Sequence, residues 1–150
     1  MTSNKKIILD WYDGIVEGFI EALDKEDWVY VKLVAWDMAN NLKVYCVLDV
    51  DKFNMNVFFN FFEHQKPEFP TWVPSKLTDK EQYLINIFLK NLFDLSTKKK
   101  LVISNDIEQG VIKTHNVNSN NLYYKDINYD IEAIANMSNE NLQEWLNLFT

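Results

Sequence analysis

The first fifty residues contain four apolar runs that are separated by very short polar breaks. The runs cover residues 7 to 12, 15 to 23, 28 to 36 and 42 to 50, and the breaks read "DG", "DKED" and "DMANN". Breaks of this length connect antiparallel neighbours, because a parallel crossover needs about a dozen residues or more. The sequence therefore predicts a meander of four antiparallel strands.

Alternation within the last two runs indicates which side of the meander faces the core. The alternating apolar residues are Val29, Val31, Leu33 and Ala35 in the third run and Leu42, Val44, Cys46, Leu48 and Val50 in the fourth. Since successive side chains of a strand point to opposite faces, we expect these rows to form the core faces. The opposite face then mixes aromatic and charged residues: Trp28, Tyr30, Trp36, Tyr45, Lys32, Lys43 and Asp49. Either a helix packs over its aromatic part, or it is a partner surface with aromatic anchors and a polar rim.

The segment after the meander is rich in aromatic residues and then in proline. Residues 51 to 62 fit a short buried helix that begins at Asp51 or a further strand, and we prefer the helix. Three prolines between residues 67 and 74 predict an extended connector, which places Phe69 and Trp72 on the body of the domain.

The second half of the chain predicts helices and further strands. Thr78 and Glu81 match a capping box ahead of an apolar stripe that reaches residue 95, so a helix is expected to pack on the sheet. "KLVISND" and "GVIKTHNV" predict a hairpin, and alternation over residues 127 to 135 predicts another strand. Ser138 is expected to cap a last helix, whose apolar residues are Leu142, Trp145, Leu146 and Phe149. Residues 1 to 150 are thus expected to form a single α+β domain: an antiparallel β-meander of four N-terminal strands with about three more C-terminal strands, packed with two to three helices.

The chain is acidic, and its basic residues are all of one type. All fifteen basic residues are lysine, and the formal net charge is −7. Without arginine the chain lacks the guanidinium group that binds phosphates and guanine bases through two parallel hydrogen bonds. The excess of acidic residues also repels a phosphate backbone. We therefore expect no nucleic-acid partner. Residues 1 to 51 carry ten acids against five lysines, which favours a basic protein partner.

Residues that commonly carry catalysis or metal binding do not cluster in the sequence. Cys46 is the only cysteine and lies on a predicted core face, and neither His64 nor His115 has a second histidine at helical spacing. The "LDVD" sequence could hold a divalent cation, although Asp51 is better explained as a helix N-cap. We predict no catalytic residue, no metal site and no cofactor. The single cysteine and the lack of a membrane-spanning apolar run favour a cytoplasmic protein without membrane association.

The meander brings distant acids together. In an up and down arrangement the second break and the end of the fourth strand lie at the same end of the sheet. Five carboxylates should therefore converge there and form either a well-solvated set of turns, a weak metal site or an acidic docking rim for a basic protein. The predicted partner-binding residues are Asp24, Glu26, Asp27, Trp28, Tyr30, Asp49 and Asp51.

The pattern "LDWYDGIVEG", followed by "VKLVAWD" and "LKVYCVLDVD", resembles the opening of small bacterial proteins encoded beside polymorphic or contact-dependent toxins. The resemblance covers about the first fifty residues, and those proteins are considered to be immunity proteins. It implies a small cytoplasmic protein that binds a cognate toxin domain, in many cases a nuclease, and neutralises it without catalysis or cofactor. It transfers no binding residues, so the choice of site depends on the charges alone.

A second hypothesis is a small enzyme or ligand-binding domain. It would place a pocket between the sheet and the "NVFFNFF" segment, with Glu17, Glu21 or a histidine as the acid or base. The sequence does not determine the oligomeric state.

Overall fold

The N-terminal meander is present as predicted. The computed structural model describes residues 5–21, 28–62, 64–95, 100–104, 107, 122–124 and 131–148. Four antiparallel strands lead the chain: β1 Lys6–Trp11, β2 Ile15–Glu21, β3 Trp28–Asp37 and β4 Leu42–Val50. The first turn contains Asp13 and Gly14, whose φ angles of 51° and 121° are positive, as the "DG" sequence predicts for a hairpin.

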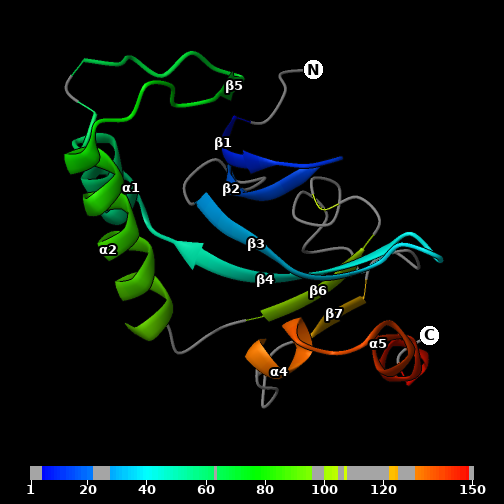
Figure 1. Cartoon of the computed structure of the whole chain (residues 1–150). Helices are drawn as coiled ribbons and strands as arrows, with labels where there is room; N and C mark the ends of the chain where they lie inside the picture. Colours follow the sequence, from blue (N-terminus) through cyan, green and yellow to red (C-terminus); the bar gives the residue numbers. More distant parts are fainter. Residues whose placement is uncertain are drawn as a thin grey trace.

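Three more strands extend the meander at its two edges (Figure 1). The described sheet has seven strands in the order β5-β1-β2-β3-β4-β6-β7. β5 Thr71–Trp72 pairs in parallel with β1, and β6 Lys100–Ser104 lies antiparallel between β4 and β7 Leu122–Tyr124. The predicted second strand of the C-terminal hairpin, "GVIKTHNV", lies outside the described residues.

The helices begin where the sequence places their caps. The described helices are α1 Lys52–Phe59, α2 Asp79–Leu95, α4 Ile131–Ala135 and α5 Asn139–Asn147. The Asp51 carboxylate accepts a hydrogen bond of 2.8 Å from the Asn54 backbone N–H, and Ser138 caps α5 in the same way. Thr78 and Glu81 form the expected reciprocal box. The helix that we preferred at Asp51 is thus confirmed, as are the helices after Thr78 and Ser138.

The strand predicted over residues 127 to 135 is wrong where the structure describes it, because residues 131 to 135 form α4. Ile127 and Tyr129 lie outside the described residues. In α4 the buried Ile134 and the half-buried Ile131 are three residues apart and therefore share one helical face, while Glu132 and Ala133 between them are exposed. Strict alternation at this point came from residue types that also favour a helix, alanine and glutamate among them.

The register between β3 and β4 corrects the predicted faces. Tyr30 pairs with Leu48 and Val31 pairs with Val47. Because directly paired residues point to the same face, the two apolar rows that we assigned to one core face lie on opposite faces of the sheet from Val29 to Leu33. For the same reason the aromatic face of the prediction does not exist as one surface, since Trp28 and Tyr30 lie on one face and Tyr45 on the other. Beyond the bulge between Leu33 and Ala35 the register shifts, and Ala35 pairs with Val44 and shares its face.

Both faces of the central strands are buried, which explains why both rows are apolar or aromatic. The first face is covered by α1 and α2 at one end and by α4 and α5 at the other (Figure 1). Its largest cluster packs Tyr30, Phe19 and Trp72 against Met55, Phe58 and Ile85 of the helices. The second face gathers Ile8, Ile20, Val31, Tyr45 and Val102, and Ile107 belongs to the same cluster. Phe69 and Trp72 of the connector pack on the first face, as predicted.

Candidate functional site

The predicted acidic site lies at the end of the sheet where β3 begins and β4 ends. Trp28 pairs with Val50, so the strand ends that flank residues 22–27 lie beside Asp49 and Asp51. Both of these aspartates are exposed. Asp24, Glu26 and Asp27 lie outside the described residues. The register therefore agrees with the predicted end of the sheet, and two of the five carboxylates can be placed there.

Trp28 and Tyr30, predicted as the aromatic contacts of this site, are core residues. Tyr30 is 1% exposed, and Trp28 packs against Phe59 and Phe69 with ring centroids 6.2 and 5.9 Å apart. A side chain that α1 and the connector cover is not available to a partner without unfolding of the covering segment. Of the two explanations for the aromatic residues, helix packing is the one that holds for Trp28 and Tyr30.

Sequence reasoning missed the aromatic residue that is exposed at this end. Phe53 lies in the first turn of α1, beside Asp51, and its side chain is 74% exposed. A helical projection could have found it, because Met55 and Phe58 define the buried face of α1 and Phe53 lies about 200° away from Met55. We call Asp49, Asp51 and Phe53 the acidic end.

A tyrosine and a glutamate are hydrogen-bonded to each other on the first face of the sheet, which the helices cover. The Tyr30 hydroxyl donates a short hydrogen bond to the Glu17 carboxylate, and Phe93 of α2 packs edge-on against the Tyr30 ring. Burial, and secondly the Glu17 charge, raise the pKa of Tyr30 far above its ordinary value. The phenol is therefore protonated at neutral pH. Glu17, which the enzyme hypothesis named as an acid or base, has the role of acceptor for this buried hydroxyl.

A small pocket lies between the end of α1 and the start of α2, where Asn60 and Phe61 of the "NVFFNFF" segment line it, rather than between that segment and the sheet. Its volume is about 160 Å³, and it is lined by Asn60, Phe61, His64, Thr78, Lys80, Glu81 and Leu84. The Nε2 atom of His64 lies 3.8 Å from Oε1 of Glu81. Oε2 of Glu81 is buried and has no hydrogen-bond partner among the described residues. The hydrogen bond from the Thr78 backbone lowers the pKa of Glu81 against the opposing effect of burial, and His64 adds to the lowering.

Three large apolar side chains are exposed at the opposite end of the sheet. Trp11 and Tyr12 at the β1–β2 turn are 55% and 66% exposed, and Met38 at the β3–β4 turn is 66% exposed. The "DG" break at residues 13 and 14 predicts a hairpin turn here. The turn is confirmed, but it also presents two aromatic side chains outward. The position of Trp11 and Tyr12 in the sequence could have indicated their exposure. Aromatic residues directly before a tight turn have little of the strand beyond them on which their side chains could pack.

Among the described residues, the structure contains neither a cluster of metal-ligating side chains nor a helix that could span a membrane. Over the ranges that the structure describes, no three histidine, cysteine, aspartate or glutamate side chains are grouped so that they could hold a metal ion. Within the same ranges, no helix is both long enough and apolar enough to cross a bilayer. Comparison of the chain with protein-family models, with curated proteins and with solved structures found no match.

Proposed function

We propose that this protein is a non-enzymatic inhibitor of the immunity-protein type, which binds and neutralises a cognate basic toxin domain, such as a nuclease, in the bacterial cytoplasm. The observation that carries the proposal is the acidic end, where the exposed ring of Phe53 in the first turn of α1 follows the exposed carboxylates of Asp49 and Asp51, with Lys52 as the one exposed base among residues 49–53. The resemblance of residues 1 to 50 to immunity proteins supports it, as does the net charge of −7.

The physical reason is complementarity of charge and shape. An exposed aromatic ring surrounded by charged side chains is the composition of a protein interface, with the ring as anchor and the charges as rim. Acidic groups at the rim speed the approach of a basic partner, and this acceleration decreases as ionic strength rises. Blocking a toxin domain requires only tight binding over its active site, so no catalytic group is needed in the inhibitor.

The test uses the C-terminal domain of a large secreted protein, if one is encoded immediately upstream of this chain. Growth of cells that express this domain and the binding affinity of the purified pair are measured with wild type and variants. Phe53→Ala and Asp49→Lys should each weaken binding about tenfold, equal to roughly 1.4 kcal/mol. Asp51→Ser should weaken it less, because serine keeps the N-cap of α1 and removes only the charge.

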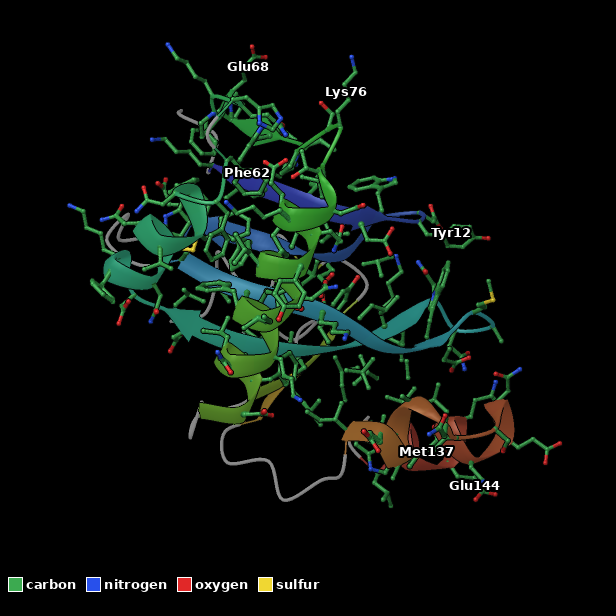
Figure 2. The ribbon with its side chains drawn as sticks, turned by 60° about the vertical axis from the view of Figure 1, so that its left-hand side comes forward. Tyr12, Phe62, Glu68, Lys76, Met137 and Glu144 are labelled. Carbon is green, nitrogen blue, oxygen red and sulfur yellow. The ribbon has the colours of Figure 1, made fainter. Side chains whose placement is uncertain are left out.

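The matched control is Glu144→Lys, because it makes the same charge change as Asp49→Lys at an exposed position of α5, which covers the other end of the sheet from α1 (Figure 2). Glu144→Lys should change affinity by less than about twofold, within the effect of net charge alone. Equal affinity of wild type and Phe53→Ala for a bound toxin would move the interface elsewhere. Absence of any binding or protection by the wild-type chain would remove the inhibitor proposal itself.

A second candidate function is a small ligand-binding domain or enzyme. The observation that favours it is the convergence of His64 and Glu81 in one pocket, at 3.8 Å, with a buried carboxylate oxygen that lacks a hydrogen-bond donor among the described residues. A screen of small amines, guanidines and amides by nuclear magnetic resonance tests it. Shifts confined to the pocket, and lost in Glu81→Gln, are expected if it binds a hydrogen-bond donor; an absence of such shifts counts against it.

A further inference from the structure

The two turns at the far end of the sheet form one surface. The ring of Tyr12 in the β1–β2 turn stacks edge-on against Trp36 at the end of β3, with centroids 6.1 Å apart. Trp11 precedes Tyr12, and Met38 follows Trp36 by two residues. We call Trp11, Tyr12, Trp36 and Met38 the turn surface. Figure 2 shows Tyr12 projecting from the end of the β1–β2 hairpin, away from the labelled residues of the connector and of α5.

A buried lysine holds the two turns together. The Nζ of Lys43, whose side chain is buried, donates a 2.6 Å hydrogen bond to the Asp13 carbonyl oxygen and lies 4.7 Å above the Trp36 ring. Gly14 is favoured beside it, because its φ of 121° is strained for a residue with a side chain. Burying an ammonium is costly unless it is fully engaged, and here a carbonyl and an indole face engage it. The turn surface is therefore fixed in advance of any binding.

The exposed charges of the two turns themselves, residues 10–14 and 36–43, are all of one sign. Residues 10–14 and 36–43 contain four charged side chains: Asp10, Asp13, Asp37 and Lys43. Asp10 and Asp13 are exposed, Asp37 is buried against Asn40 and Gln143, and Lys43 is the buried lysine between the turns. A partner that approaches this surface meets exposed aromatic rings and carboxylates but no exposed ammonium from either turn. Such a surface is complementary to lysine and arginine side chains, which stack on aromatic rings and pair with carboxylates.

We propose that the turn surface is a docking site for a basic polypeptide segment, whose lysine or arginine side chains lie against Trp11 and Tyr12 and pair with Asp10 and Asp13. The site is distinct from the acidic end. Val29, at the start of β3, pairs with Asp49, whereas Trp36 lies at the other end of the same strand and Met38 directly follows it. The proposal goes beyond the inhibitor function, since it holds whether or not the partner of the acidic end is a toxin.

The experiment compares two fluorescent peptides of equal length, one of alternating arginine and leucine and one of alternating glutamate and leucine. Binding is measured by anisotropy, and its location by amide chemical shifts of the labelled full-length protein. The arginine peptide should bind and shift the amides of residues 10–14 and 36–43 more than those of residues 49–53. Trp11→Ser/Tyr12→Ser should weaken its binding at least tenfold, as expected when exposed aromatic anchors are removed.

Two further variants separate the contribution of each group. Val73→Ser/Tyr83→Ser is the matched control, because these side chains are 56% and 65% exposed, close to the values for Trp11 and Tyr12. It should leave binding within twofold of wild type. Asp13→Asn keeps a residue that tolerates the positive φ of 51° and removes the charge, so it should weaken binding and reduce its salt dependence.

Four outcomes would overturn the proposal. Equal binding of the two peptides would remove the basic specificity. Shifts centred on residues 49–53, or affinity unchanged in Trp11→Ser/Tyr12→Ser, would place the site elsewhere. A concentration-dependent dimer in sedimentation that Trp11→Ser/Tyr12→Ser dissolves would make a second copy of the chain the occupant of the turn surface. Circular dichroism of each variant confirms that a loss of binding comes from the site and not from unfolding.

Discussion

Replacement of Tyr30 by phenylalanine isolates the buried hydroxyl that joins β3 to Glu17 of β2. The substitution keeps the ring and its contacts with Phe19 and Phe93 and removes only the donor to the carboxylate. A hydrogen bond to a charged group contributes about 1.5 to 3 kcal/mol, and Glu17 is left half-buried without this donor. Against a total stability of roughly 7 to 22 kcal/mol for a chain of this length, the loss is measurable at neutral pH.

The same substitution should change how stability depends on pH. The folded state raises the pKa of Tyr30 far above the unfolded value near 10, so above pH 10 the unfolded chain loses a proton that the folded chain keeps. The contribution of the Tyr30 proton is therefore fully present below pH 10 and is lost as pH rises, at about 1.4 kcal/mol per pH unit. The difference in the free energy of unfolding between wild type and Tyr30→Phe at neutral pH, divided by this slope, gives the pH at which the two proteins become equally stable. That pH is about 11 to 12.

The assay is urea unfolding followed by far-ultraviolet circular dichroism, at pH values from 7 to 11.5, for wild type, Tyr30→Phe and Tyr12→Phe. Tyr12→Phe is the control, because it removes the same hydroxyl from a side chain that is 66% exposed. It should follow the wild-type curve within about 0.5 kcal/mol, the usual range of a surface change. The reasoning fails if the wild-type and Tyr30→Phe curves stay parallel from pH 9 to 11.5, or if both tyrosine variants lose the same stability at pH 7.

Two further substitutions test the close approach of β1 to β2 and the junction with α5. Gly18→Ala places a methyl group against the Ile7 carbonyl oxygen of the neighbouring strand, well inside van der Waals contact, and should cost about 2 to 3 kcal/mol or roughly 5 to 10 °C in Tm. Val16→Ile is the control, because it adds a methyl group on the same strand and should lower the free energy of unfolding by less than about 1.5 kcal/mol, as measured by calorimetry. Equal Tm values for the two variants would show that β1 does not approach Gly18 closely. Asp37 has a lowered pKa, because hydrogen bonds, including one from Gln143 of α5, outweigh the effect of burial. The stabilisation by the Asp37 carboxylate is present above the unfolded pKa near 4 and is lost as pH falls through the folded pKa. Asp37→Asn should therefore lower the free energy of unfolding by about 1 kcal/mol at pH 7, and its Tm should fall less than that of wild type between pH 4 and 2. The same decrease of Tm in both proteins over this pH range would contradict this.

What the sequence determined by itself is the set of features that depend on neighbouring residues. The four strands follow from alternation and from breaks too short for any other connection, and Asp51, Thr78 and Ser138 cap helices through atoms only three residues away. The Asp13 and Gly14 turn is equally local, since positive φ angles are a property of those residue types. These elements could be read without knowledge of the rest of the chain.

The tertiary structure alone decided which surfaces exist. The register of β3 on β4 separates Trp28 and Tyr30 from Tyr45, and α1 and α2 then bury the first two, so a predicted binding pair became core. Residues 131 to 135 alternate like a strand but form a helix whose Ile134 packs on Val44 and Leu101. The turn surface depends on Lys43 reaching across to Asp13, thirty positions earlier in the chain. Each of these outcomes is set by contacts between distant residues, and patterns within a single segment carry no information about such contacts.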